Sequence, residues 1–340
     1  MKILIVKLSS IGDVIHTLPV ISAIKKSLPN AKISWIVEKK SAEILRNNEY
    51  LHQLIEIDTH TLRKTKSLTE FTRQRKMLRE ETYDIALDFQ GLLKSAAIAK
   101  LTKSKRRFGF AKAALREPAS RFLLSEKIDV PKNIHIIRKN LTLAEKALKL
   151  KPTLEDFSFP IFTEAKHELE AMQIIEQSGE NFAILNPAGG WVTKLWSAEK
   201  FGELADKIYA EKGLVSVVSF APNEESLAEK VIAASKSKNI VKAKLSLKGF
   251  YELAKRAKIY VGGDTGPTHL AVAAKCPIVG IFGPTEWWRN GSPNSADICV
   301  ERTDINCRTD CHRRSCDKWI CMDISVEKVF SAVNKRLETL

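Results

Sequence analysis

Short apolar stretches alternate with longer amphipathic ones along this chain, and that alternation constrains its fold more than any other feature. In the first half, each run of strand length is followed by a helical stretch. Strands are expected at residues 3–6, 32–37, 53–57 and 83–87, and helices at 19–28, 41–47, 67–81 and 92–103. Strands separated by helices run parallel, because each connection crosses over the sheet. The pattern therefore predicts a doubly wound α/β sheet.

The same pattern starts again after residues 151–160, a proline-containing stretch that we interpret as a linker. Strands are expected at residues 182–185, 215–220, 240–241, 257–261 and 278–282, and helices at 199–211, 224–235, 247–254, 268–274 and 326–339. A length of 340 residues also favours two domains over one. We predict domains at residues 1–155 and 160–325, a terminal helix at 326–340, and a central cleft that both domains face.

The stretch Val261-Gly-Gly-Asp-Thr-Gly-Pro-Thr-His-Leu-Ala271 combines a strand end, a glycine turn and a helix start. The first N–H groups of a helix lack partners and its dipole is positive there, so such a turn can bind an anion. Asp264, Thr265 and Gly266 are expected at its mouth, with His269 one turn into the helix. The alternative is an ordinary helix cap, because Asp or Thr before Pro also begins helices that bind nothing.

Two further loops follow strands of the second half. Backbone N–H groups at Gly189 and Gly190 could line a phosphate, and Lys194 adds a positive charge nearby. Glu224 follows the next strand, where a carboxylate suits a ribose diol. The alternative for Glu224 is an acid that the helix dipole favours.

The first strand ends in a comparable turn, Ser9-Ser-Ile-Gly-Asp-Val-Ile-His16. Asp13 is expected at the carboxyl end of this strand, where open α/β sheets bind ligands. A carboxylate there can cap the next helix, or it can act as general base on an acceptor hydroxyl. Lys7 leaves the same strand end and could hold an anion.

Charge is distributed unevenly along the chain. The net charge is +15, and residues 1–150 hold all of it, with 30 Lys and Arg against 15 Asp and Glu. Residues 151–340 are neutral, with 25 residues of each sign. A one-sided excess indicates an anionic partner: nucleic acid, an anionic membrane surface, or a phosphorylated or carboxylated substrate. The sequence contains no nucleic-acid-binding motif and no basic helix with interleaved aromatics, so nucleic acid is not the expected partner.

Five separated motifs stand in order along the chain: Lys7-Leu-Ser-Ser-Ile-Gly-Asp-Val-Ile-His-Thr-Leu-Pro19, Asp88-Phe-Gln-Gly-Leu-Leu-Lys-Ser95, Arg116-Glu-Pro118, Lys194-Leu-Trp196 and Asp264-Thr-Gly-Pro-Thr-His269. With these motifs the sequence resembles the family 9 glycosyltransferases from residue 1 to about residue 290. The resemblance implies the GT-B fold, with two Rossmann-like domains. It also implies inverting transfer of heptose from ADP-heptose, with no cofactor and no catalytic metal.

Carried over position by position, the resemblance implies roles for matching residues. Asp13 matches the catalytic base, and Lys194 is expected to stabilise the charge on the leaving diphosphate. With the loop glycines, the residues expected around the donor are Gly189, Gly190, Lys194, Glu224, Asp264, Thr265, Gly266 and His269. Those expected near the acceptor's phosphates and carboxylates are Lys7, Arg63, Lys64, Lys66 and Arg116.

The expected acceptor is a lipid A precursor bearing 3-deoxy-octulosonic acid, held by the first domain, with the donor on the second. One rival is another family 9 transferase, acting on a later core acceptor or with a different nucleotide sugar. The other is a non-enzymatic nucleotide or nucleic-acid binder. Residues 1–7 turn polar too soon for a secretory signal, and no apolar run approaches the roughly 18 residues of a membrane span. We therefore expect a cytoplasmic protein, with peripheral contact at the inner membrane surface.

Cys307, Cys311, Cys316 and Cys321 lie together in sequence, with His312 among them. Their gaps of three, four and four residues are wider than the two-residue gaps common in zinc sites. A cytoplasmic setting disfavours disulfides. A structural metal, one or two disulfides and plain thiols all stay open as interpretations.

Overall fold

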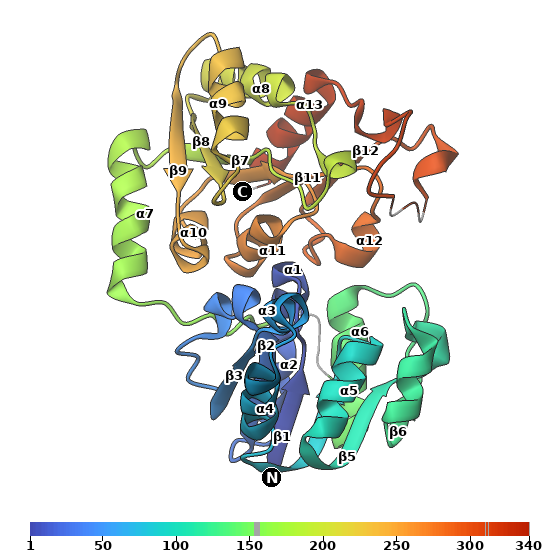
Figure 1. The fold of residues 1–340 in the computed structure, drawn as a ribbon. Helices are drawn as coiled ribbons and strands as arrows, with labels where there is room; N and C mark the ends of the chain where they lie inside the picture. The colour runs from blue at the N-terminus through green and yellow to red at the C-terminus, as the bar shows by residue number, and fades with distance from the viewer. Residues whose placement is uncertain (153–156, 310, 312, 340) are drawn as a thin grey trace. The chain divides into compact units, whose positions relative to one another are not determined.

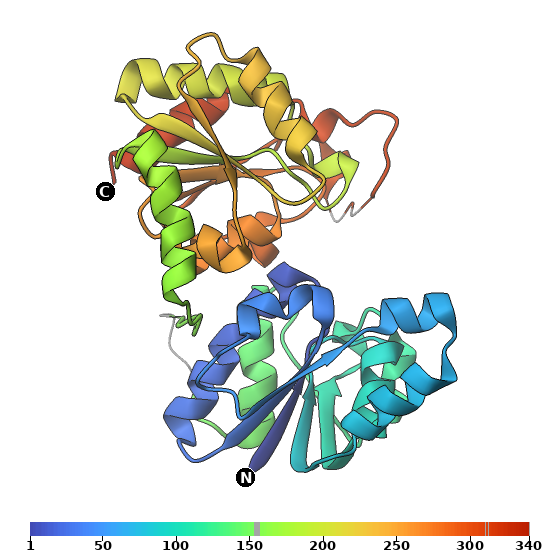
Figure 2. The same ribbon diagram turned by 60° about the vertical axis from the view of Figure 1, so that its left-hand side comes forward.

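The computed structural model describes residues 1–152, 157–309, 311 and 313–339, and it divides into two compact units, Met1–Phe162 and Thr163–Leu340. Residues 153–156 of the expected linker lie outside the described residues, and so do the expected domain limits at 155 and 340. Each unit is built around one parallel sheet of six strands (Figures 1 and 2). The α/β class and the two doubly wound sheets that the sequence predicts are confirmed.

The first unit orders its strands β3-β2-β1-β4-β5-β6. They are β1 (Lys2–Val6), β2 (Lys32–Glu38), β3 (Gln53–Ile57), β4 (Thr82–Asp88), β5 (Lys103–Phe110) and β6 (Glu126–Ile128). The helices are α1 (Ile11–Ile15), α2 (Leu18–Ser27), α3 (Thr59–Thr65), α4 (Leu68–Met77), α5 (Leu93–Leu101) and α6 (Ile136–Leu148). Central β1 is apolar on both faces, as expected of a strand in a parallel sheet, and residues 3–6 are fully buried. Leu4 and Val6 share one hydrophobic core with α5 and the end of α4. Helices α2 and α6 pack against each other.

The second unit orders its strands β12-β11-β10-β7-β8-β9. They are β7 (Phe182–Asn186), β8 (Val215–Phe220), β9 (Ile240–Lys244), β10 (Ile259–Gly262), β11 (Ile278–Phe282) and β12 (Ile298–Glu301). The helices are α7 (Ala165–Ser178), α8 (Ala198–Lys212), α9 (Glu225–Ala234), α10 (Leu247–Ala254), α11 (Gly266–Ala273), α12 (Trp287–Asn290) and α13 (Val326–Leu337). Helices α8, α9 and α13 close one core over the sheet, and α10 packs between α7 and α11.

Three sequence-based expectations about elements were wrong. Residues 41–47 form two short 3₁₀ turns, Lys39–Ser41 and Glu43–Leu45, in place of a helix. The helix expected at 67–81 ends at Met77, and a separate helix, α3, precedes it. Strand β5 was missed because its first half is Lys-Ser-Lys-Arg-Arg, whose long side chains are mostly exposed and hide the apolar alternation.

The strand order places two loops side by side in each unit. In the first unit the chain leaves β1 toward β2 and leaves β4 toward β5, so the loops after β1 and β4 diverge from neighbouring strands. In the second unit β7 and β10 are neighbours, and the chain leaves β7 toward β8 and β10 toward β11, so their loops also diverge. Open α/β sheets bind ligands at such switch points, outside the carboxyl ends of the strands.

Candidate active site

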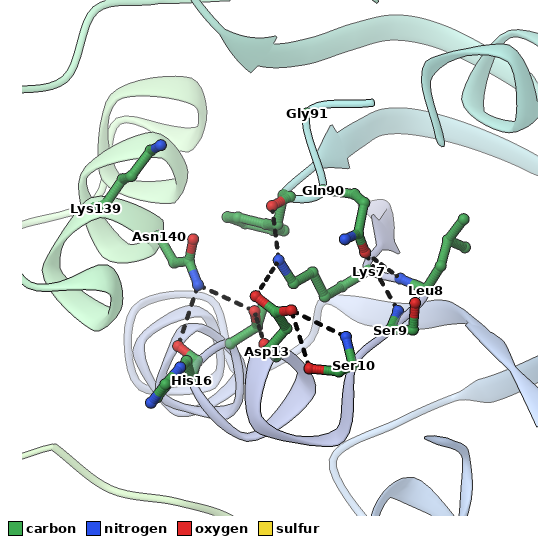
Figure 3. Close-up of polar contacts among 12 residues, drawn as sticks. Lys7, Leu8, Ser9, Ser10, Asp13, His16, Gln90, Gly91, Lys139 and Asn140 are labelled. Carbon is green, nitrogen blue, oxygen red and sulfur yellow. Dashed lines mark hydrogen bonds and ion pairs between the residues drawn. The ribbon is translucent and has the colours of Figure 1, made fainter. Parts of the chain in front are cut away.

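The segment after β1 carries an ion pair between the buried Lys7 and the partly exposed Asp13 (Figure 3). The Lys7 side chain is only 4% exposed, and its Nζ lies 3.2 Å from Asp13 Oδ1 and donates to the Phe89 carbonyl at 3.1 Å. The other carboxylate oxygen, Asp13 Oδ2, accepts hydrogen bonds from the Ser10 N–H at 2.9 Å and the Ser10 hydroxyl at 3.2 Å. Asp13 therefore caps α1, and its side chain is still 39% exposed.

These contacts keep Asp13 ionised. Burial alone would raise the pKa of the Asp13 carboxyl, but the charge of Lys7 and the hydrogen bonds from Ser10 outweigh it and hold the pKa below its ordinary value. The Asp13 carboxylate is thus ionised at neutral pH, although its lowered pKa makes it a weak base. Asp13 can be both a helix cap and a general base. The cap uses only Oδ2, and Oδ1, which lies beside Lys7 Nζ, makes no contact with the helix start.

Gln90, in the loop after β4, fastens the Asp13 loop to the neighbouring strand. Its side-chain Oε1 accepts the N–H of Leu8 at 2.9 Å and the N–H of Ser9 at 3.2 Å (Figure 3). Gln90 belongs to the motif Asp88-Phe-Gln-Gly-Leu-Leu-Lys-Ser95, but no local sequence pattern indicates its function. Its partners are 81 and 82 residues away in sequence, so only the adjacency of β1 and β4 could have revealed the role.

Gln90 is itself held by Asp88, the last residue of β4. Asp88 Oδ1 accepts the N–H of Gln90 at 2.9 Å and of Gly91 at 3.3 Å, while Oδ2 accepts the Ser95 hydroxyl at 2.9 Å. Because the Asp88 side chain is almost fully buried, its pKa is raised to about 6 despite these donors. The motif from Asp88 to Ser95 is therefore a support for the Asp13 loop.

The basic residues expected near the acceptor lie on the same unit but make few contacts. Arg63 and Lys64 occupy the last turn of α3, and Lys66 caps its end. All three side chains are exposed, and so is Arg116, which lies between two 3₁₀ turns. The start of α3 is fixed by Glu38, whose carboxylate accepts the N–H of Thr59 at 3.1 Å. The contact of these four basic residues with an acceptor stays a prediction.

In the second unit, Lys194, Asp264 and His269 form one buried cluster. Lys194 Nζ lies 2.6 Å from Asp264 Oδ2 and 3.1 Å from the Asp264 carbonyl, and His269 Nε2 lies 3.2 Å from Asp264 Oδ1. All three side chains are less than 10% exposed. Burial would raise the pKa of Asp264, yet the hydrogen bond from His269 and the charge of Lys194 hold it far below its ordinary value. The loops after β7 and β10 are thereby joined.

Lys194 keeps capacity for a ligand within this cluster. An ammonium group has three N–H donors, and the contacts with Asp264 use two of them. The Nζ atom also lies 4.0 Å from the centre of the Trp191 ring, which favours a cation at this position. The sequence correctly proposed a fixed positive charge here, but it did not reveal the partners.

The start of α11 retains its anion-binding capacity. Neither Asp264 nor Thr265 caps this helix with its side chain, although Thr265 occupies the cap position and a proline lies in the first turn. The Asp264 carboxylate is instead held by Lys194 and His269. The alternative of an ordinary side-chain cap is therefore wrong, and the first N–H groups of α11 are not taken by these side chains.

Close packing explains two glycines at this edge. A Cβ at Gly263 would lie 3.3 Å from the Lys194 carbonyl oxygen, and one at Gly189 would lie 2.9 Å from a methyl group of Leu195. Gly190 faces open space, so its lack of a side chain leaves its backbone accessible. Glu224 caps a turn, because its Oε2 accepts the Ala221 N–H at 2.9 Å. Its predicted contact with a ribose stays a prediction.

The six cysteines of the chain are free thiols in this structure. Cys321 is buried, Cys311 is half-buried, and Cys307 and Cys316 are exposed. His312 lies outside the described residues. Within the described part of the chain, no group of three or more His, Cys, Asp or Glu side chains is placed to hold a metal ion. No helix there is both long and apolar enough to cross a bilayer.

Comparison with known proteins places these features in a family. The profile of Glycosyltransferase family 9 (heptosyltransferase) matches residues 71–320. Lipopolysaccharide heptosyltransferase 1 of Escherichia coli (strain K12) is 30% identical over 291 residues, which cover 84% of this chain and 89% of that protein. Lipopolysaccharide heptosyltransferase 1 of Pseudomonas aeruginosa is 28% identical over 321 residues, which cover 93% of this chain and 87% of that protein.

A solved structure agrees with the fold. The E. coli heptosyltransferase WaaC with ADP-2-deoxy-2-fluoro heptose superimposes with a TM-score of 0.77 at 25% identity, covering 100% of this chain and 99% of that chain. The two six-stranded parallel sheets are thus those of a GT-B fold. Because the profile spans more than half of the chain and a relative reaches 30% identity over most of it, this protein belongs to glycosyltransferase family 9.

Proposed function

We propose that this protein is an inverting heptosyltransferase that moves heptose from ADP-heptose to the inner core of lipopolysaccharide. The observation that carries the proposal is the similarity, over most of the chain, to proteins named lipopolysaccharide heptosyltransferase 1. The two polar clusters, one at the switch point of each sheet, supply the groups that such a reaction needs. The acceptor is assigned to the first unit and the donor to the second.

The acceptor step is assigned to Asp13. Its carboxylate is ionised at neutral pH and partly exposed, so it can accept the proton of an acceptor hydroxyl. A carboxylate with a lowered pKa is a weak base. Transfer therefore becomes favourable only as the new C–O bond forms and the hydroxyl becomes acidic. Lys7 fixes the carboxylate in place and keeps it charged until that moment.

The donor step is assigned to Lys194 and the start of α11. In an inverting transfer the acceptor oxygen bonds to the anomeric carbon while the bond to the diphosphate breaks on the opposite face. ADP leaves with the electron pair of that bond, and the proton passes to Asp13. The remaining donor of Lys194 and the first N–H groups of α11 can stabilise the charge on the departing diphosphate.

The acceptor class follows from the relatives' names and the positive charge of residues 1–150. A lipid A precursor with 3-deoxy-octulosonic acid offers phosphates and carboxylates to the exposed Arg63, Lys64, Lys66 and Arg116, whereas Lys7, also expected near the acceptor, is buried against Asp13. Such a lipid lies in a membrane, so the enzyme is assigned to the cytoplasm with peripheral contact at the inner membrane. The proposal includes no catalytic metal and no cofactor beyond the ADP-heptose substrate.

A turnover assay tests the proposal. The enzyme is given ADP-heptose with deacylated acceptors that carry either no heptose or one heptose, and ADP release is measured for each. Release with the heptose-free acceptor, abolished in Asp13→Asn, supports the assignment. Turnover only with the heptose-bearing acceptor, or only with another nucleotide sugar, would replace it with a different family 9 activity. No turnover with any sugar donor would contradict enzymatic function.

A further inference from the structure

Helix α4 in the first unit is poorly covered for a helix of a folded domain. Of its ten residues, only Gln74 is buried, and the neighbouring α3 has no buried residue. Leu68 is 79% exposed and Phe71 is 42% exposed. Large apolar side chains this exposed, on one surface helix, indicate a surface that binds a partner.

The outward side of α4 also lines a recess of positive charge. Leu68, Thr72 and Arg75 are four and three residues apart, so they lie along one side of the helix, away from buried Gln74. Arg79, just beyond the end of α4, is half-buried and donates to the Leu101 carbonyl at 3.1 Å. A shallow recess of about 590 Å³ is lined by Thr72, Arg75, Lys76, Arg79, Glu80 and Lys103. Four cations and one carboxylate thus share this surface.

The positive charge of the recess is not neutralised by the protein. Among the described residues, no ion pair is formed by Arg75, Lys76 or Lys103. Lysines nearby on the same sheet are paired, as Lys105 is with Asp84 at 2.9 Å and Lys2 is with Glu81 at 2.7 Å. Arg75, Lys76 and Lys103 therefore add positive charge, without an ion pair, around the outward side of α4 and the adjoining start of β5.

We propose that the outward side of α4, from Leu68 to Arg79 together with Lys103, docks on an anionic lipid surface. Basic side chains beside exposed apolar ones match the two layers of a bilayer surface, headgroup phosphates above and acyl chains below. A small soluble anion would use the cations but gain nothing from Leu68 and Phe71. With two exposed apolar residues and four cations, binding is electrostatic and reversible.

This inference rests on the proposed function only in that a membrane-borne acceptor gives docking a purpose. The basic recess lies at the end of α4 and the start of β5, near the amino end of the sheet, whereas the Asp13 loop leaves the carboxyl end. Only the apolar residues Leu68 and Phe71, at the start of α4, lie nearer that end. Charge changes on α4 should therefore affect access to acceptors in a membrane without affecting the chemistry.

Vesicle sedimentation tests the proposal with the full chain. Phosphatidylcholine vesicles with and without phosphatidylglycerol are titrated against the wild type, R75E/K76E and L68Q/F71Q. Since each basic residue near the surface contributes about a factor of five, the charge reversal should weaken binding to anionic vesicles about 30-fold or more. The apolar variant should weaken it less, and neutral vesicles should bind poorly. A control, K26E/K132E, makes the same charge change at exposed residues outside α4.

Turnover separates this proposal from the proposed function. With a deacylated soluble acceptor, R75E/K76E should keep the wild-type kcat and KM, while the KM for acceptor in vesicles rises. Vesicle binding unchanged by R75E/K76E, or weakened equally by K26E/K132E, would overturn the docking surface. A raised KM for the soluble acceptor would also overturn it, in favour of a site for a soluble phosphorylated ligand. Absence of turnover in the wild type would contradict the proposed function and leave vesicle binding as an independent result.

Discussion

Replacing Gln90 is the sharpest test of how the first unit holds its proposed base. Gln90→Met keeps the length of the side chain but removes the oxygen that accepts the N–H groups of Leu8 and Ser9. Leu8 is fully buried, so its N–H would lose its partner without access to water. A hydrogen bond of this kind contributes about 1 kcal/mol, so the two together contribute about 2 kcal/mol.

That free energy predicts two measurable effects. For a domain of this size, about 2 kcal/mol lowers the Tm by roughly 4–8 °C. If it also holds the Asp13 loop in its working geometry, the population of that geometry falls by up to about 30-fold. We therefore expect kcat with a soluble acceptor to fall about 10- to 30-fold, with little change in the KM for ADP-heptose. Gln90→Glu retains oxygens that accept both N–H groups and should recover most of the Tm.

Gln74→Met is the matched control. Gln74 is also buried in the first unit, and its amide donates to the Asp58 carbonyl and to Glu70, away from the Asp13 loop. The control should lose a similar amount of stability and keep its turnover. If Gln90→Met loses stability but turns over normally, or if Gln74→Met loses as much turnover, then Gln90 only stabilises the fold.

Four further predictions follow from the same contacts. Asp13→Asn should fold and bind ADP normally but lose roughly 10²- to 10⁴-fold in turnover, and near-normal turnover would leave Asp13 a helix cap only. The folded pKa of Asp88, raised to about 6, lies above its unfolded value near 3.8, so the folded state binds the extra proton, and the contribution of Asp88 to the free energy of unfolding should rise as pH falls from 6 to 4. Thermal melts of Asp88→Asn should lack that rise, and a rise equal to the wild type's would refute the cause. Arg116→Ala should raise the KM for acceptor more than that for ADP-heptose, while Lys194→Ala should weaken ADP binding and lower kcat; equal effects on both substrates would contradict the division of labour. Activity should survive EDTA, and complete loss that magnesium or manganese restores would show a catalytic metal.

The architecture could be predicted from the sequence, whereas the roles expected for individual residues stay predictions and their contacts could not be predicted. Local patterns predicted the strands at 53–57, 215–220 and 278–282 with the bounds that the structure shows, because those runs are bordered by clear polar or turn residues. They missed β5, whose basic residues mask its period, and β6, which has only three residues. Strand β12 and helices α6 and α7 were also not predicted. Asp13 and Lys194 were proposed as isolated groups, because no local pattern indicates which distant side chain will face them.

The strand order explains why the missing partners lie where they do. In each unit the strand that comes first in the sequence, β1 or β7, pairs with a strand that begins roughly 75 to 80 residues later, β4 or β10. The loops after the two paired strands meet at the switch point. Lys7 therefore contacts the Phe89 carbonyl, and the backbone between Lys7 and Asp13 contacts Gln90. In the second unit Lys194 contacts Asp264. In both cases a lysine with little exposure to water pairs with an aspartate, and the Lys–Asp contact joins residues at the edge where ligands bind. A charged pair of this kind contributes little net stability, because the cost of removing charge from water offsets the attraction. Its larger effect is on geometry: it fixes the proposed base in the first unit and the proposed diphosphate-binding ammonium in the second.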